Sequence, residues 1–176
     1  MKILAISGSG RANSTNTAML RAVADIARPD HSISVYSDIA DLPVFSPDLE
    51  TEPLPVEVQS FVDLIKESDC LIISSPEYVR AIPGGLKNAI DWLVSRDEIV
   101  NKPIALMHAS HRGDDMLGQL RLVLSTVSQQ FSQDLFLRFE LIKLSPEEVS
   151  NHMAMVSHRS AVVGFLKNLT ERYQQP

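Results

Sequence analysis

A loop rich in phosphate-binding residue types follows the first apolar segment of the chain. It runs from Gly8 to Thr17 and reads GSGRANSTNT. Glycines let backbone N–H groups approach an anion, and the helix that begins within the loop adds the positive end of its dipole. Side-chain donors are also frequent there: Ser9, Arg11, Ser14, Asn16 and Thr17. Several neutral donors and one cation suit the dianion of a phosphate monoester, although a plain turn with a helix cap uses the same residue types.

The sequence lacks the motifs of several other kinds of site. No Gly-Lys-Ser/Thr follows at the spacing of a Walker A loop, which argues against a nucleoside triphosphatase. Asn13 stands where the third glycine of a GxGxxG dinucleotide fingerprint would be. The histidines show no tight ligand spacing with Cys70 or with a carboxylate pair, so no metal site is predicted. In particular, His152 and His158 stand six apart and are not expected to share a helix face.

The segment from Pro76 to Pro83 has the features of a rigid ligand-binding loop. Proline fixes φ near both of its ends, so its backbone groups can be held against the edge of a planar ring such as a flavin. Tyr78 can flank the face of that ring. By itself Tyr78 would be a surface aromatic, and only the phosphate loop favours a ligand there. Glu77 either orients the loop through hydrogen bonds or faces solvent.

The segment from His108 to Gly113 is predicted to close the other side of the ring. Ser110 and Gly113 can donate hydrogen bonds to the ring edge or the ribityl chain, and Arg112 can contact a phosphate. His108 is interpreted as a partly buried strand-end residue and His111 as a loop residue. Neither histidine is assigned a catalytic role.

Apolar runs predict the strands that position these loops. They are continuous rather than alternating, as in buried parallel strands: Ile3–Ser7, Ile33–Tyr36, Cys70–Ser74, Ile104–His108 and, more weakly, Leu135–Phe139. Stretches with helical spacing alternate with them, which predicts a doubly wound α/β fold with helices on both faces of the sheet. Five strands favour the flavodoxin-like order 2-1-3-4-5, in which the loops after the first, third and fourth strands converge. A last amphipathic run, from Val149 to Tyr173, is predicted to form one long helix packed across the sheet.

Size and composition bound the remaining possibilities. The chain has 176 residues, of which 44% are hydrophobic, so residues 1–176 are expected to form a single domain. A net charge of -6 argues against binding to nucleic acid or to an anionic membrane. No apolar run is long enough to span a membrane, and the first residues do not form a secretory signal. With a single cysteine, Cys70, a reducing cytoplasmic location and small-molecule partners are expected.

Two motifs together resemble the NADPH-dependent FMN reductase family, which includes azoreductases and reductases of chromate and quinones. The first, G-S-x-R-x-x-S-x-N, begins at Gly8. The second, P-E-Y-x-x-x-x-P-G-x-L-K-N-A-I-D-W, runs from Pro76 to Trp92. The resemblance covers almost the whole chain.

The resemblance implies a flavodoxin-like fold, non-covalent FMN, and a dimer or tetramer that associates through the Leu86–Trp92 helix. In the family, hydride passes from NADPH or NADH to flavin N5, the nucleotide leaves, and the flavin then reduces a quinone, azo compound, metal oxyanion or free flavin. Because the flavin carries the chemistry, no side chain is predicted to be catalytic. The cofactor-binding residues expected are Ser9, Arg11, Ser14, Asn16, Thr17, Pro76, Glu77, Tyr78, Val79, Ser110, Arg112 and Gly113. Tyr78 and Arg80 are expected to contact the substrate.

Two departures from the family pattern keep an alternative open. Val79 and Arg80 stand where the family usually has Asn and then a small residue or His, and the segment from Ser110 to Asp115 replaces a small, Gly-rich turn. We hypothesise that Arg80 recognises the phosphates of NADPH or an anionic acceptor. The alternative function is an FMN-binding redox sensor or electron carrier without efficient NAD(P)H turnover.

Overall fold

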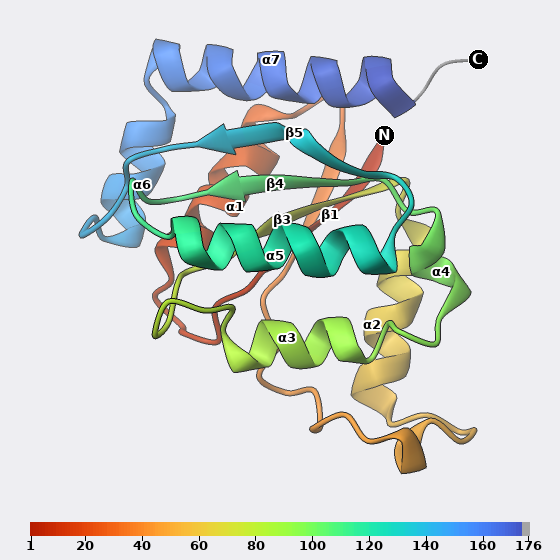
Figure 1. Ribbon diagram of the computed structural model, residues 1–176. Helices are drawn as coiled ribbons and strands as arrows, with labels where there is room; N and C mark the ends of the chain where they lie inside the picture. The colour runs from red at the N-terminus through yellow and green to blue at the C-terminus, as the bar shows by residue number, and fades with distance from the viewer. Residues whose placement is uncertain (174–176) are drawn as a thin grey trace.

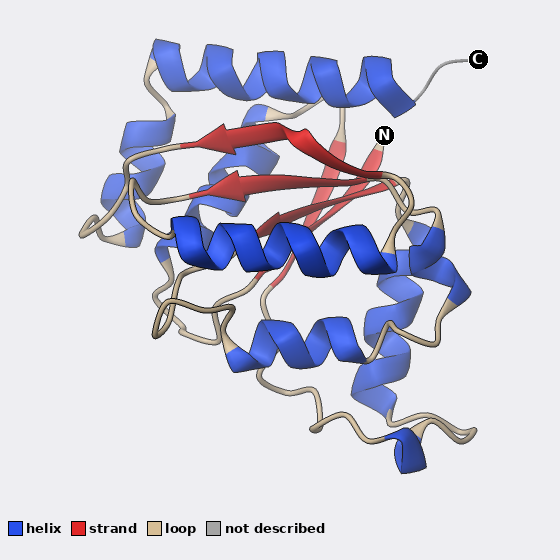
Figure 2. Ribbon diagram, in the orientation of Figure 1, coloured by secondary structure: helices blue, strands red, loops and turns tan. Residues whose placement is uncertain are grey.

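The computed structural model describes residues 1–173, so the last three residues of the predicted 1–176 domain lie outside it. Its centre is a five-stranded parallel sheet with the order β2-β1-β3-β4-β5, which confirms the predicted flavodoxin-like fold (Figure 2). The strands are β1 Lys2–Ser7, β2 Ser32–Tyr36, β3 Cys70–Ser74, β4 Ile104–His108 and β5 Phe131–Arg138. Strand β5 begins four residues earlier than predicted, and its pairing with β4 shifts register between Ile104 and Leu106. This irregular, partly exposed edge explains its weak apolar pattern.

Helices cover both faces of the sheet (Figure 1). One face packs against α2 Val56–Glu67, α3 Gly84–Asp91 and α5 Asp114–Val127, with the short α4 Asp97–Val100 beside them. The other face packs against α1 Thr15–Ile26, α6 Pro146–Met153 and α7 Val156–Tyr173. Successive side chains of a strand point to opposite faces, so Leu4 and Ile6 belong to the first core and Ile3 and Ala5 to the second. Both faces are buried, which is why the strands read as continuous apolar runs.

The prediction of one long C-terminal helix was wrong. The segment forms α6 and α7, which meet at a corner after Ala154, and Val156 is 82% exposed rather than part of the apolar face. Val149 and Met153 of α6 and the buried face of α7 all join the second core, but α6 packs mainly on α1 while α7 follows β5. A single straight helix could not make both sets of contacts.

The corner between α6 and α7 also corrects the expectation for its histidines. The rings of His152 and His158 lie 4.7 Å apart, and His158 Nδ1 contacts the carbonyl oxygen of His152. The turn brings together two side chains that one continuous helix would separate. No group of three or more candidate metal ligands occurs among residues 1–173.

Helix α3 anchors the long connection between β2 and α2. The Asn88 side chain donates to the carbonyl oxygen of Pro43 at 3.0 Å and accepts from the N–H of Phe45 at 2.8 Å. Trp92, directly after the helix, is fully buried and donates to the same Pro43 oxygen. The polar members of the second motif therefore hold a surface segment in place, and the apolar members, Leu86, Ala89 and Ile90, are buried within the chain's own core. Within residues 1–173, no helix has the length and apolar character needed to cross a membrane.

Replacing Asn88 with Ala should lower the free energy of unfolding by about 2 kcal/mol, because it removes the acceptor of the Phe45 N–H and one of the two donors to the Pro43 oxygen. Lys87→Ala is the matched control on the same helix. Lys87 forms an exposed ion pair with Asp91, so its loss should change stability by about 0.5 kcal/mol or less. Urea unfolding of both variants checks this, and equal effects would contradict the anchoring role.

Gly8 should be far less tolerant of substitution than a glycine on an open helix face. A Cβ at Gly8 would lie 2.6 Å from Ser75 Oγ and 2.8 Å from Leu86 Cδ2. We expect Gly8→Ala to cost about 1–3 kcal/mol through overpacking. Gly118, in the middle of α5, has nothing within 4 Å of the added methyl, so Gly118→Ala should stabilise the protein by about 0.5–1 kcal/mol. Opposite shifts of the urea midpoint would confirm the contrast.

Candidate functional site

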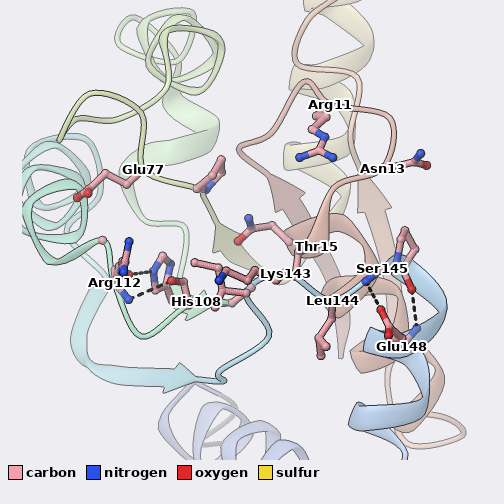
Figure 3. Close-up of a pocket in the computed structure, with 17 residues that line it drawn as sticks. Arg11, Asn13, Thr15, Glu77, His108, Arg112, Lys143, Leu144, Ser145 and Glu148 are labelled. Carbon is pink, nitrogen blue, oxygen red and sulfur yellow. Dashed lines mark hydrogen bonds between the residues drawn. The ribbon is translucent and has the colours of Figure 1, made fainter.

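A cavity of about 730 Å³ opens where the strands end at their carboxyl side (Figure 3). The three predicted loops, after β1, β3 and β4, all reach it, which confirms that they converge. A fourth loop, between β5 and α6, forms another wall. The lining residues are Arg11, Asn13, Thr15, Asn16, Pro76, Glu77, His108, Ala109, Ser110, Arg112, Gly113, Ile142, Lys143, Leu144, Ser145, Pro146 and Glu148. The volume is within the range typical of small-molecule sites.

The N-terminus of α1 is the feature of the cavity best suited to an anion. Ser14 caps this helix and accepts from the N–H of Thr17, while Thr15 and Asn16 of the first turn line the cavity. The first turn contains no acidic residue. Helices α5 and α6 also begin beside the cavity, but their first turns are acidic. That of α5 contains Asp114 and Asp115, and that of α6 contains Glu147 and Glu148. Of the three helices that begin beside the cavity within residues 1–173, only α1 has no carboxylate in its first turn, and such a helix end suits a phosphate.

Two buried hydrogen bonds fix this helix end to the sheet. Thr17 Oγ1 lies 2.7 Å from Ser7 Oγ of β1, and Ser74 Oγ of β3 donates to Asn16 Oδ1 at 2.8 Å. Because its carbonyl oxygen is used in this way, Asn16 retains its NH2 group for a ligand. The first turn of α1 is therefore held in register with both central strands.

The predicted phosphate donors divide into two groups. Arg11 and Asn16 line the cavity, whereas Ser9, Ser14 and Thr17 are buried and do not. Ser9 Oγ accepts from the N–H of Arg11, and the other two hydroxyls cap and anchor α1. Gly8 also differs from expectation, because its N–H donates to the carbonyl oxygen of Ser74 and does not face a ligand.

In the loop after β3 as well, some of the predicted binding residues line the cavity and others do not. Pro76 and Glu77 line the cavity, and Glu77 Oε2 accepts from the N–H of Met116 in the first turn of α5. Glu77 thus orients the loop, one of its two predicted alternatives. Beyond it, Tyr78 and Ala81 form a short antiparallel bridge outside the cavity lining.

Val79 and Arg80 form the tip of this bridge, and both have positive φ, at 51° and 59°. Val79 is 99% exposed. The Arg80 guanidinium forms an ion pair with Asp115, and its carbonyl oxygen accepts from Gln119. Arg80, predicted to bind substrate phosphates, is therefore occupied by a carboxylate of α5.

His108 connects the loops after β3 and β4. Its buried ring contacts the carbonyl oxygens of Ser75 and Arg112 through Nδ1 and Nε2. Burial lowers the pKa of His108 below its ordinary value, while the carbonyl of Arg112 acts in the opposite direction. Gly113, with φ at 103°, caps α5 against this ring, where a Cβ would lie 2.7 Å from Nε2. The ring therefore sets the shape of the turn that presents Ser110 and Arg112 to the cavity.

Sequence reasoning missed the wall formed by the β5–α6 loop. This wall consists of Ile142 to Pro146 together with Glu148. Ser145 and Glu148 form a reciprocal capping box at the start of α6. The S-P-E-E sequence from Ser145 to Glu148 signals such a helix start, but nothing in it shows that the helix begins beside the other three loops.

Known proteins of similar sequence are named as reductases. A quinone reductase from Escherichia coli (strain K12) is 32% identical over 113 residues, which are 62% of this chain and 60% of that protein. An NAD(P)H-dependent FMN reductase from Pseudomonas aeruginosa is 37% identical over 112 residues, with the same coverage. The match thus spans about 60% of the length of these relatives.

Solved structures show the same fold at lower identity. The flavoenzyme NAD(P)H:(acceptor) oxidoreductase from Paracoccus denitrificans has a TM-score of 0.74 and 22% identity over 98% of each chain. The apo form of an NADH:FMN oxidoreductase has a TM-score of 0.66 and 24% identity, covering 99% of this chain and 91% of that one. The family model for NADPH-dependent FMN reductases matches residues 1–136. The chain therefore belongs to the NADPH-dependent FMN reductase family.

Proposed function

We propose that this protein binds FMN and transfers electrons from NAD(P)H to a small-molecule acceptor. The observation that carries the proposal is the acid-free N-terminus of α1, which opens with Arg11 into the cavity at the carboxyl ends of the strands. A helix end and a cation in that position suit a phosphate monoester. The family membership supports FMN as the molecule that bears it.

The residues present fit the cofactor in this proposal. Arg11, the Asn16 amide and the first N–H groups of α1 hold the phosphate, while the loops after β3 and β4 receive the ring. When bound, FMN supplies the two-electron chemistry, taking hydride from NAD(P)H and passing the electrons on. The protein contributes position and electrostatics, and no side chain acts as a nucleophile or base.

A two-step, ping-pong order and a quinone acceptor are the finer parts of the proposal. The names of relatives support a quinone, since they include a quinone reductase and a 2-hydroxy-1,4-benzoquinone reductase. An azo compound, a metal oxyanion or free flavin are the other acceptors that the motifs suggest. In the proposed order, the nicotinamide and the acceptor use the same ring face in turn.

The loop after β3 favours a second candidate function. Val79 and Arg80 replace the usual residues of the family, and Arg80 is tied to α5 through Asp115 and Gln119. A loop held in this way would bind FMN yet hinder the approach of a nicotinamide. The second candidate is a redox sensor or electron carrier.

Assembly and location complete the proposal. The proposal includes a single domain of residues 1–176 that self-associates through the outer side of α3, where Gly84 and Lys87 are exposed. A cytoplasmic location is supported by Cys70, a free thiol buried in β3. Burial raises the pKa of the Cys70 thiol to about 12, so it does not react as a thiolate.

The first experiment is the visible spectrum of the purified protein, followed by anaerobic addition of NADPH. A yellow protein that bleaches far faster than the same concentration of free FMN is the expected result. A yellow protein that does not bleach would favour the sensor or carrier. A colourless protein that does not take up added FMN would refute the proposal.

A second prediction separates phosphate recognition from ring recognition. Arg11→Gln should weaken FMN binding about tenfold to hundredfold, which is the range of one charge-assisted hydrogen bond. The same variant should bind riboflavin, which has no phosphate, as the unchanged protein does. Arg159→Gln, which removes an exposed arginine of α7 outside the cavity, is the matched control. Equal losses for FMN and riboflavin in Arg11→Gln would contradict the assignment.

A further inference from the structure

The charges that line the cavity are not balanced within it. Three cations face it, Arg11, Arg112 and Lys143, against two carboxylates, Glu77 and Glu148 (Figure 3). Among residues 1–173, none of these three cations forms a salt bridge. In a chain whose net charge is -6, this is a local positive region.

Both carboxylates of the cavity are already engaged by backbone groups. Glu77 accepts from the N–H of Met116, and Glu148 accepts from the N–H of Ser145. The nearest carboxylates of α5 are also paired, Asp114 with Arg138 and Asp115 with Arg80. None of these four carboxylates forms a salt bridge with Arg112 or Lys143.

The backbones that carry Arg112 and Lys143 are held together. The carbonyl oxygen of Arg112 contacts His108, and its N–H donates to Ser110 Oγ at 3.0 Å. On the other side, Phe139 donates to the carbonyl oxygen of His108 at 2.9 Å and Leu141 to that of Ala109 at 3.3 Å. The β5–α6 loop that bears Lys143 is therefore fastened to the β4 loop that bears Arg112.

The flavin phosphate does not account for these two cations. In the proposed function that phosphate lies at the N-terminus of α1, where Arg11 and the helix dipole meet its charge. Lys143 also lies beyond residues 1–136, the part that the family model matches.

We propose that Arg112 and Lys143 form a second anion site, which selects a cosubstrate bearing a phosphate, sulfonate or carboxylate group. This inference rests on the proposed function. The anion comes either from the electron acceptor or from the 2′-phosphate of NADPH. Two cations on separate loops clamp it beside the ring, so that a negatively charged cosubstrate binds more tightly than a neutral one of the same shape.

The test uses the FMN-loaded protein with Arg112→Gln, Lys143→Gln and the double variant. The control is Lys66→Gln with Arg159→Gln, which removes the same charge from exposed positions outside the cavity. Equilibrium binding of 1,4-naphthoquinone-2-sulfonate, followed by the change in the flavin spectrum, should weaken about tenfold in each single variant. Binding of neutral 1,4-naphthoquinone should stay within about twofold, and Lys143→Arg should restore sulfonate binding.

The source of the anion is decided by a kinetic comparison of NADPH with NADH. A KM for NADPH that rises about tenfold while that for NADH does not would assign the site to the 2′-phosphate. Loss confined to the sulfonate would assign it to the acceptor. Unchanged binding of both anions, or a loss of FMN affinity without a loss of riboflavin affinity, would overturn the second site. If NADPH oxidation is absent altogether, the proposed function fails, but the equilibrium binding still decides whether the anion site exists.

Discussion

The close approach of β1 to β3 is the constraint on which the rest of the site depends. Strand β1 pairs with β3 up to Ser7 and Ser74, and Gly8 continues the ladder by donating to the Ser74 oxygen at 2.7 Å. No side chain fits at Gly8, since a Cβ would meet Ser75. This contact brings the loops after β1 and β3 together and leaves room for a ligand above both strand ends.

The same contact places the positive end of α1. A hydrogen bond between the Ser7 and Thr17 hydroxyls and one from Ser74 to Asn16 tie the first turn of the helix to both strands. Buried polar pairs of this kind are costly to leave half satisfied, so they define one orientation of the helix. The positive end of the helix dipole then points into the cavity, and its own first turn contains no carboxylate. The position of an anion thus follows from the packing of two strands.

At the other two helix N-termini beside the cavity, carboxylates meet the positive end of the helix dipole. Helix α5 begins with two aspartates and also receives Glu77 from the β3 loop, and α6 begins with a capping box. These carboxylates stabilise the helices on which the loops rest. Within residues 1–173, the lysine and the two arginines that line the cavity form no salt bridge with these carboxylates. Helix stability and ligand recognition therefore draw on different residues of the same region.

The sequence by itself determined the fold class, four of the five strands to within a residue and the convergence of three loops. Continuous apolar runs indicate strands that are buried on both faces of the sheet, and the residue types that suit a phosphate can be read directly from the GSGRANSTNT loop. Only the tertiary structure decided which donors face the cavity, because Ser9, Ser14 and Thr17 are neutral hydrogen-bonding residues like Asn16 but do not line it. It also decided that Arg80 pairs with Asp115, a residue 35 positions away in the sequence. In the same way, Lys143 joins the site because folding brings the loop after β5 beside the loops of other strands. Periodicity records which face of an element is buried, whereas the partner of a charged side chain is set by the neighbour that folding brings to it.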